Sequence, residues 1–438
     1  MVRLAVIADD LTGANDTAVQ FAKRNISACV QINFDEEKIL QEKSDVIVVD
    51  TDSRDDSATD AYQKVKRVSS IFKNSGAKQV YKKVDSTLRG NLGAEIAAAA
   101  EVFCPDIVVI APAFPNNQRT TVGGYHFLNG VPIELTEIAH APKTPVHESQ
   151  IIKLLQTQTE HKIAEIPLAV ICRGRAAIAD AVRDKVNAGE FWLVFDVAKE
   201  THFDEIIQAV KSYKKVLWVG SAGLADHLPA FWEWSTQQKT IPALFDGPAF
   251  IVAGSVSHIT QGQIKELLSN TQTALIKLDI EKFLNDGDQE LLRCVREATA
   301  CVLEKRDVLL ASALTDEDVE AAVKAGKKKG LDDKEVSELT ARAMAAITEK
   351  IELTKVAGLV LTGGDTAVHV CRALRADSIE VLDEVAVGIP LGRLNGGSCD
   401  GINVVTKAGA FGDKESFLQA VRAIKNLTGS KAEYRRTV

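Results

Sequence analysis

Residues 81–91 read YKKVDSTLRGN, a short segment that carries two lysines, an acid, two hydroxyl groups, an arginine and a glycine. The segment offers cations for an anionic ligand and a carboxylate that could accept a proton. Two other polar turns follow apolar runs: DDLTGA at residues 9–14 follows Leu4–Ala8, and AFPNNQRTT at residues 113–121 follows Ile107–Ile110. Strand-like runs with polar side chains at their carboxyl ends are typical of the ligand-binding edge of an open α/β sheet.

The charged side chains of this segment have distinct expected roles. Lys83 and Arg89 are candidate anion holders, whereas Lys82 is expected to face solvent. Asp85 is either a base, within reach of a ligand hydroxyl, or the structural partner of Lys83. The segment alone therefore predicts an anion site with an acid beside it.

Further hydroxyl groups and charges extend this candidate site. Ser86 and Thr87 either bind hydroxyl groups of a ligand or cap the next helix. Asp9 and Asp10 are adjacent on an extended segment, so only one of them is expected to face a ligand. Asp9 is the preferred ligand contact, and Asp10 is the better helix cap. Arg54, in DSRDD after the run 46–49, either clamps a carboxylate with two hydrogen bonds or forms a surface ion pair with a neighbouring aspartate.

Glycine-rich turns dominate the second half of the chain. They predict phosphate contacts from seven residues: Ser255, Gly363, Gly364, Asp365, Thr366, Lys407 and Gly409. A helix that starts directly after such a turn presents free N–H groups to an anion. Lys407 is the better phosphate candidate because it lies beside glycines, while Asp365 either reaches a metal through water or is a simple helix N-terminal charge. Tight turns also use glycine for geometry alone, and neither a P-loop nor a GxGxxG fingerprint occurs.

The composition is that of a soluble globular protein with more than one domain. The 438 residues exceed one ordinary core, and 46% are hydrophobic and 26% charged. The net charge of −8 argues against nonspecific nucleic-acid binding. Seven cysteines without a CxxC pair, and no leader or apolar run long enough to span a bilayer, favour a cytoplasmic protein that does not contact a membrane.

Alternating apolar and helical stretches predict an α/β fold with mostly parallel sheets flanked by helices. Two domains are expected, at residues 1–235 and 246–438, with the active site in the cleft between them. The strand-like runs include Leu168–Ile171, and a charged two-helix block spans 315–351, with Thr315 and Asp318 as a capping pair. Residues 390–397, PLGRLNGG, are expected to form a further glycine-rich loop that makes Arg393 available.

Six motifs in order, from residue 4 to about residue 415, resemble the four-carbon acid sugar kinase family. They are IADDLTGANDTAVQFA, KVDSTLRGN, APAFPNNQRTTVGGYHFLNGVPI, GSAGLADHL, TGGDTAVHV and GIPLGRLNGG followed by VVTKAGAFGD. The resemblance implies an N-terminal acid-sugar-binding domain and a C-terminal nucleotide-binding domain. It implies that Asp9, Arg54 and the segment Lys83–Arg89 hold substrate, and that Ser255, the turn Gly363–Thr366 and Gly409 hold ATP.

Members of this family phosphorylate the terminal hydroxyl group of a tetronate, so the resemblance implies an ATP-dependent kinase. The DDLTGAND turn is more similar to D-threonate or D-erythronate kinases, because 3-oxo-tetronate kinases tend to carry Phe where this chain has Leu11. Two departures affect the expected contacts: Gln118 stands where glycine is expected, and Ala410 replaces a glycine beside the expected phosphate contact.

The expected reaction is transfer of the ATP γ-phosphoryl group to the 4-hydroxyl of D-threonate. Asp85 is expected to orient the hydroxyl group and Asp9 to bind substrate or act as base. Mg²⁺ is expected to bridge the phosphates and to be held largely by water, with no dedicated protein metal site. D-erythronate and 3-oxo-tetronates are the alternative acceptors, and a non-catalytic sensor of nucleotide or acid sugar is the alternative class. A homo-oligomer is possible; nucleic acid is not an expected partner.

Overall fold

The computed structural model describes residues 2–32, 35–141, 143–234 and 247–426. The chain divides into two compact units, residues 1–237 and 238–438. The predicted boundary segment, residues 235–246, lies outside the described residues. Among the described residues, no helix is both long and apolar enough to cross a membrane.

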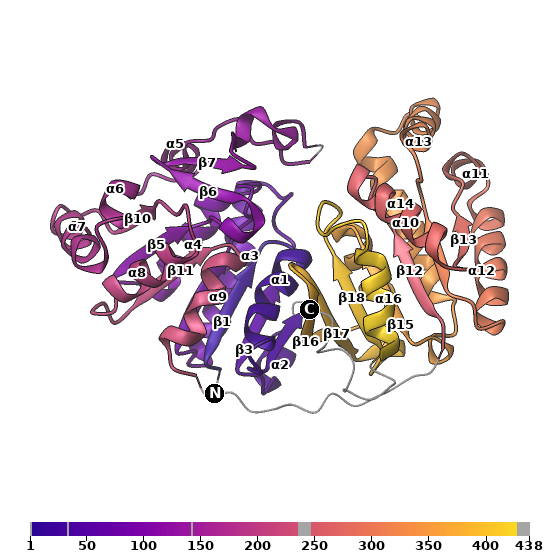
Figure 1. Cartoon of the computed structure of the whole chain (residues 1–438), viewed down its shortest axis with the longest axis horizontal. Coiled ribbons are helices and arrows are strands. Elements are labelled where there is room, and N and C mark those ends of the chain that lie inside the picture. Colours follow the sequence, from indigo (N-terminus) through magenta and orange to yellow (C-terminus); the bar gives the residue numbers. More distant parts are fainter. Residues whose placement is uncertain (1, 33–34, 142, 235–246, 427–438) are drawn as a thin grey trace. The chain divides into compact units, whose positions relative to one another are not determined.

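A parallel sheet forms the centre of the first unit (Figure 1). Its described strands pair side by side in the order β2 (Ala28–Gln31), β3 (Val46–Asp50), β1 (Leu4–Ala8), β4 (Gln79–Lys83), β11 (Val216–Gly220), β5 (Ile107–Ala111), β10 (Trp192–Phe195) and β9 (Ile163–Ile166). All of their pairings are parallel. The residues of β1, β3 and β5 are buried throughout, as expected for strands covered on both faces.

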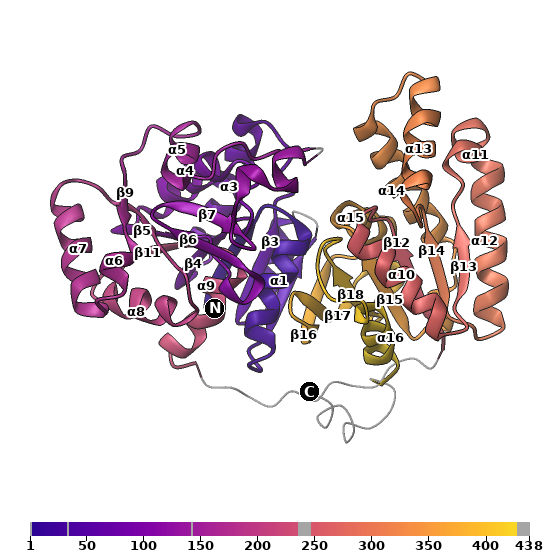
Figure 2. The same cartoon turned by 45° about the horizontal axis from the view of Figure 1, so that its top comes forward.

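Helices cover both faces of this sheet (Figure 2). One face carries α1 (Leu11–Ala22), α8 (Thr201–Ala209) and α9 (Ala222–Phe231), and the other carries α3 (Ala58–Asn74) and α4 (Leu92–Phe103). The core beneath α3 and α4 joins Val68, Phe72 and Ile96 to Ile7 and Ile47 of the strands. The remaining helices are α2 (Glu36–Gln41), α5 (Ile151–Gln156), α6 (Leu168–Ile171) and α7 (Arg175–Asn187), and a small antiparallel sheet contains β6 (Arg119–Val122), β7 (Tyr125–Leu128) and β8 (Val131–Pro132).

The direction in which the chain is wound reverses between β1 and β4. The chain proceeds from β1 by way of α1 to strands on one side, and from β4 by way of α4 to strands on the other side. Because α1 and α4 lie on opposite faces, the carboxyl ends of β1 and β4 form the kind of edge at which open α/β sheets bind ligands. The turns 9–10, 51–54 and 84–91 leave the sheet at this edge.

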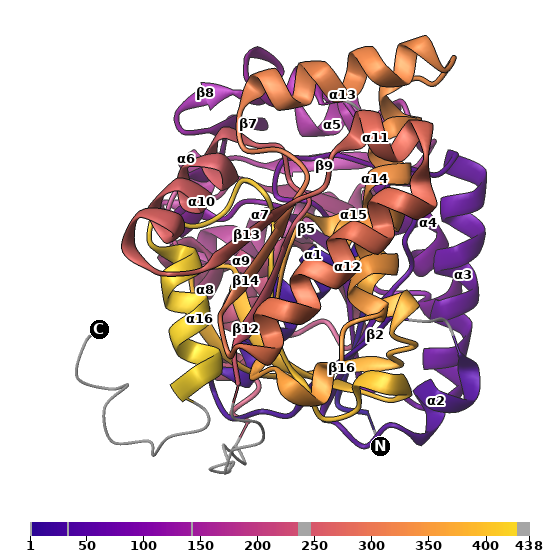
Figure 3. The ribbon, with the colours of Figure 1, turned by 90° about the vertical axis from the view of Figure 1, so that its right-hand side faces the viewer.

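The second unit repeats the design with a mixed sheet (Figure 3). Its strands pair in the order β13 (Ala274–Lys277), β14 (Val308–Ala311), β12 (Ala249–Ala253), β15 (Gly358–Thr362), β18 (Asn403–Lys407), β17 (Ile389–Asn395) and β16 (Ser378–Ala386). The first five are parallel, while β17 runs antiparallel to β18 and β16. Here the winding reverses between β12 and β15, which places the turns after these strands at a second ligand-binding edge.

The helices of the second unit also lie on both faces of its sheet. One face carries α10 (His258–Asn270) and α16 (Ser416–Asn426), and α12 (Gly287–Leu303) lies over β13 and β14 on the other (Figure 3). The other helices are α11 (Ile280–Asn285), α13 (Asp316–Lys328), α14 (Asp333–Glu349) and α15 (Gly364–Ala373). The α/β class with mostly parallel sheets flanked by helices is therefore confirmed, whereas the interdomain cleft stays a prediction.

Three local predictions are wrong. Residues 168–171 form α6 rather than a strand, because the Asp196 carboxylate accepts a hydrogen bond from the Leu168 N–H and anchors a helix start. Residues 390–395 belong to β17 rather than to a loop, and Gly392 is needed there because a Cβ would lie 2.7 Å from the Glu380 carbonyl oxygen of β16. The two-helix block is confirmed as α13 and α14, but the side chain of Thr315 makes no capping hydrogen bond.

Candidate functional site

Asp9 and Asp10 follow β1 directly, at the edge where the winding reverses. Asp10 is the N-cap of α1, and its Oδ1 accepts a hydrogen bond from the Gly13 N–H at 3.0 Å. The predicted capping role of Asp10 is thereby confirmed. Both carboxylates contact the guanidinium of Arg54, and the expectation that only one of the pair faces a ligand stays a prediction.

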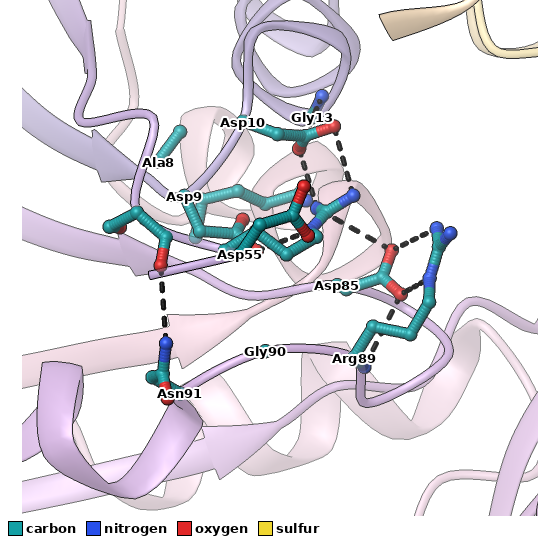
Figure 4. A network of polar contacts seen from close by, with 12 residues as sticks. Ala8, Asp9, Asp10, Gly13, Asp55, Asp85, Arg89, Gly90 and Asn91 are labelled. Carbon is teal, nitrogen blue, oxygen red and sulfur yellow. Dashed lines mark hydrogen bonds and ion pairs between the residues drawn. The ribbon is translucent and has the colours of Figure 1, made fainter. Parts of the chain in front are cut away.

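Arg54, from the turn after β3, lies at the centre of a carboxylate cluster. Figure 4 shows the acids of this cluster, Asp9, Asp10 and Asp85. Its Nε donates to Asp9 Oδ2 at 2.7 Å, and its Nη1 and Nη2 donate to the two oxygens of Asp10 at 3.0 and 2.6 Å. Its Nη2 also lies 3.7 Å from Asp85 Oδ1. The expected surface pair is wrong, because Asp55 pairs with Lys143 and Asp56 with Lys64.

Asp85 is held within its own turn. It accepts hydrogen bonds from Arg89 Nε at 2.7 Å and from the Thr87 hydroxyl group. Leu88 adopts a left-handed backbone with φ of 62°, which lets the chain return Arg89 to Asp85. Asp85 thus pairs with Arg89 rather than with Lys83, and Thr87 supports the carboxylate rather than capping α4.

The neighbouring charges set the ionisation of these acids. Burial opposes ionisation of Asp9, yet Arg54 and Lys83 outweigh it and hold the pKa of Asp9 below its usual value. Burial also opposes ionisation of Asp85, but Arg89 and Arg54 hold the pKa of this carboxyl well below its usual value. Burial raises the pKa of Asp10, and the Asp9 carboxylate adds to this rise.

Two groups of the cluster keep unused hydrogen-bonding capacity. Asp9 Oδ1 is buried and has no hydrogen-bond partner among the described residues. Lys83 is only 3% exposed, and within the described chain its Nζ donates no hydrogen bond. A Cβ at Gly13 would collide with this Nζ and with Asp10 Oδ1, so a larger residue there would displace both groups. An acceptor and a cation are therefore both available in one buried place.

His126 fixes the main chain of the turn after β4, residues 84–91. Its Nε2 lies 2.8 Å from the Ser86 carbonyl oxygen and its Nδ1 lies 3.0 Å from the Thr121 hydroxyl. Burial lowers the pKa of His126 to about 4, so the ring is neutral near pH 7 and donates to Ser86. The ring ties the turn after β4 to the small sheet.

Lys82 is the clearest correction on β4. Its side chain is fully buried, not solvent-facing, and its Nζ lies 2.8 Å from Glu95 Oε2 on α4. Alternation along the strand explains the difference, since Lys82 and Lys83 project to opposite faces of the sheet. Sequence reasoning missed Glu95 altogether; the signal was an acid in the first turn of the largely apolar helix LGAEIAAAAEVF, where it is buried among alanines and leucine.

Three turns of the second unit meet at Ser255. A Cβ at Gly409 would collide with the Ser255 hydroxyl, and one at Gly363 would lie 3.2 Å from the Ser255 amide nitrogen. A Cβ at Gly254 would likewise collide with Thr366. The structure thus brings together the turns after β12, β15 and β18, as their glycines predicted.

The helix α15 starts at this meeting point. Its N-cap is Gly363, with φ of 95°, and no side chain caps it. Gly364 and Asp365 lie in its first turn, where Asp365 is exposed and Thr366 is buried. Unoccupied N–H groups at a helix start form a ready site for a phosphate group.

Lys407 does not point to open space. Its Nζ donates to three main-chain carbonyl oxygens, of Ala408 at 2.7 Å, Gly409 at 3.2 Å and Phe411 at 3.0 Å. Burial lowers the pKa of Lys407 to about 7. The prediction of a direct phosphate contact is untested, but in this structure the side chain shapes the loop that carries Gly409.

The side chains that could bind Mg²⁺ directly show whether the protein has a metal site of its own. Within the described ranges, no cluster of three His, Cys, Asp or Glu could hold a metal ion. A protein cage for a metal therefore does not fit these residues. An ion bridging nucleotide phosphates needs only one or two protein carboxylates.

Two family models match the chain. A sugar-binding N-terminal domain matches residues 4–228, and a nucleotide-binding C-terminal domain matches residues 250–417. Among curated proteins, the chain is 33% identical to a D-threonate kinase of Salmonella typhimurium, over 97% of this chain and 99% of the relative. It is 30% identical to a D-erythronate kinase of Heliobacterium modesticaldum over 95% of both chains, and 26% identical to a 3-oxo-tetronate kinase of Brucella melitensis over 98% and 97%.

Solved structures show the same fold. A crystal structure from Salmonella typhimurium LT2 matches with a TM-score of 0.82 at 22% identity, and covers 97% of this chain and 100% of that one. Protein HI1011 of Haemophilus influenzae matches with a TM-score of 0.72 at 22% identity, over 95% and 98%.

Proposed function

The chain belongs to the four-carbon acid sugar kinase family, and from this premise we propose that it transfers the γ-phosphoryl group of ATP to the 4-hydroxyl of D-threonate. The products are 4-phospho-D-threonate and ADP. The observation that carries the proposal is the pairing of Asp9 Oδ1, an acceptor with no hydrogen-bond partner among the described residues, with the buried ammonium group of Lys83 in one cluster. A hydroxy acid supplies the complementary groups, a hydroxyl donor and a carboxylate.

Residues 1–235 are proposed to bind the sugar acid. Lys83 and Arg89 hold its carboxylate, and Ser86 lies on the same turn to contact a hydroxyl group. Arg54 has its guanidinium engaged by Asp9 and Asp10, so we assign it the placing of Asp9 beside the substrate as well as a share of the positive charge. Asp85 orients the reacting end through Arg89 and Thr87.

Residues 246–438 are proposed to bind ATP. The N-terminus of α15 after Gly363 and the hydroxyl groups of Ser255 and Thr366 meet the phosphates, supported by the close approach of Gly409 to Ser255. Lys407 holds the loop of Gly409 in shape. Asp365, exposed in the first turn of α15, is the candidate to reach Mg²⁺ through water.

The proposed chemistry needs position and charge more than covalent participation. The 4-hydroxyl oxygen bonds to the γ-phosphorus while the bond from that phosphorus to the β,γ-bridging oxygen breaks and ADP leaves. The hydroxyl proton passes to Asp9 Oδ1. The low pKa of Asp9 suits this task, since proton transfer follows substantial bond breaking in a loose transition state.

D-erythronate is the second candidate acceptor, because the D-erythronate kinase relative is 30% identical over 95% of the chain. D-threonate and D-erythronate differ only in the configuration at one carbon. An ADP-release assay with Mg-ATP and D-threonate, L-threonate, D-erythronate and 3-oxo-tetronates tests the proposal. We expect the highest kcat/KM with D-threonate. A higher kcat/KM with another acid would replace D-threonate as the proposed substrate. If the protein binds ATP but releases no ADP with any of these acids, the proposal is overturned.

A further inference from the structure

A buried ion pair lies beneath the acid cluster. The side chains of Lys82 and Glu95 are 0% and 2% exposed, and Lys82 Nζ lies 2.8 Å from Glu95 Oε2. The same Nζ donates to the Ile7 carbonyl at 3.1 Å and to the Lys83 carbonyl at 2.7 Å. All three donors of the ammonium group are thus used, and they join β4 to β1 and α4.

The pair is connected to the turn that carries Arg54. Glu95 Oε1 accepts a hydrogen bond from the Ser53 hydroxyl at 2.7 Å. The Ser53 hydroxyl also lies 2.7 Å from the Thr51 hydroxyl, which donates to the Ala8 carbonyl at 2.7 Å. The contact with Glu95 places the turn against the start of α4, the contact with Ala8 places it against the end of β1, and the contact between Ser53 and Thr51 joins the two.

The main chain carries this placement into the acid cluster. The N–H groups of Ser53 and Arg54 donate to the Asp9 carbonyl oxygen at 3.0 and 3.3 Å. The hydroxyl group of Ser53 therefore lies one residue from the guanidinium that contacts Asp9 Oδ2 at 2.7 Å. Moving this turn would move both Arg54 and Asp9.

Stability alone gives a weak reason for such a pair. Removing two charges from water is costly, and apolar residues of similar volume often serve a core equally well or better. A buried pair with every donor satisfied instead fixes one arrangement, because any shift leaves a charged group without a partner. This specificity lies directly beneath the groups that we assign to the sugar acid.

We infer that Lys82, Glu95 and Ser53 form a positioning network that sets where Asp9 and Arg54 stand for the sugar acid, an inference that rests on the proposed function. None of the three touches the reacting atoms. Their effect passes through the turn 51–54 to the buried carboxylate of Asp9.

Ser53→Ala tests the network with the smallest change. Ser69→Ala is the matched control, because Ser69 is also fully buried in this unit and its hydroxyl has no hydrogen-bond partner among the described residues. We expect Ser53→Ala to raise the KM of the sugar acid or lower kcat by about tenfold or more, with the KM of ATP unchanged. Ser69→Ala should match the wild type. Wild-type kinetics in Ser53→Ala would overturn the inference.

A double variant separates positioning from folding. Lys82→Met with Glu95→Leu replaces both charges, so no buried charge remains unpaired. We expect this variant to keep a cooperative thermal transition and ATP binding, while turnover of the sugar acid falls as in Ser53→Ala. Wild-type turnover in the folded double variant would contradict the network. If the double variant does not fold, the kinetics of Ser53→Ala decide the question, because this variant leaves the ion pair in place.

A spectroscopic measurement keeps this test independent of the substrate. The Arg54 Nε–H signal in a heteronuclear NMR spectrum, assigned with Arg54→Lys, reports the bond to Asp9. We expect Ser53→Ala to shift or broaden this signal and Ser69→Ala to leave it in place. An unmoved signal in Ser53→Ala would overturn the network even if no tested acid is a substrate. A moved signal without turnover on any acid would place the failure in the proposed function.

Discussion

Asp9 divides its two oxygens between two tasks. Oδ2 accepts from Arg54 at 2.7 Å, and Oδ1 has no partner within the described chain. The first contact keeps the carboxylate ionised and fixed, and the second oxygen remains available to a substrate hydroxyl. Asp85, with Arg89 and Thr87 bound to it, has a supporting position instead.

Asp9→Asn should abolish most turnover while preserving the fold. The amide keeps the volume of the side chain but is a far weaker base, so we expect kcat to fall by about a hundredfold or more. Steady-state ADP release measures this effect, and ATP binding should be unchanged. Asp56→Asn, which alters a partly exposed pair with Lys64, is the control. A loss of less than about threefold in Asp9→Asn would remove Asp9 as the proton acceptor.

Lys83→Met should weaken binding of the sugar acid. The methionine fills similar space without charge, so a buried carboxylate would lose its cation, and we expect the KM of the acid to rise by about tenfold or more. Lys66→Met is the matched control, since Lys66 forms an exposed ion pair with Glu101 in the same unit. Substrate-concentration series for both variants measure the difference. Equal KM values in the two would place the carboxylate elsewhere.

At the scale of elements, single side chains hold two of the turns in place. The loop after β18 is tied by Lys407, and its Gly409 carbonyl also accepts from Ser257 at 2.7 Å and Thr260 at 3.0 Å. The turn after β4 is tied by His126. The hydrogen bonds of Lys407 and of His126 both depend on the protonation state of the side chain, so each can be tested by changing the pH.

The KM of ATP should rise with pH through the range in which Lys407 loses its proton. Burial lowers the pKa of Lys407 to about 7, and a neutral amine has only two N–H donors for three carbonyl oxygens. The loop therefore loosens above that pH. We expect the ratio of the ATP KM values for Lys407→Met and wild type to fall as pH rises from about 6 to about 8.5. A constant ratio would contradict this role.

His126 should make stability depend on pH. The folded chain holds the ring neutral down to about pH 4, whereas the unfolded ring binds a proton below its ordinary pKa of 6.5. The stabilisation is therefore present above pH 6.5 and is lost as pH falls toward 4, by about 2 kcal/mol at about pH 5. Urea unfolding at two pH values should show a smaller acid loss in His126→Gln than in wild type. The exposed His140→Gln is the control, and equal losses in all three proteins would refute the role.

At the scale of the whole molecule, the sequence contains enough to predict the α/β class and the sheet edges at which the polar turns gather. Apolar runs such as 4–8 and 107–111 are strands because they are buried on both faces, and polar residues after them mark the edge. The glycines at 363 and 409 are likewise predictable, because Gly363 lies close to the main chain of Ser255 and Gly409 lies close to its side chain. These are local signals.

The hydrogen-bond and ion-pair partners of the charged side chains were not predictable, because they depend on contacts between segments that are distant in the sequence. Arg54 binds Asp9 and Asp10 across the sheet edge rather than its neighbours Asp55 and Asp56. Lys82 finds Glu95 in the core, and Lys407 folds back onto its own loop. The helix at 168–171 has the same difficulty, since four apolar residues have no distinguishing period and Asp196 decides their conformation.

The most direct test of the account is the identity of the product. Protein incubated with Mg-ATP and D-threonate should give one new phosphomonoester signal in the phosphorus NMR spectrum, coupled to the two protons of C4, and Asp9→Asn should give none in the same time. This result would establish both the acceptor hydroxyl and the role of Asp9. A phosphate on another carbon, or only inorganic phosphate released from ATP, would contradict the account.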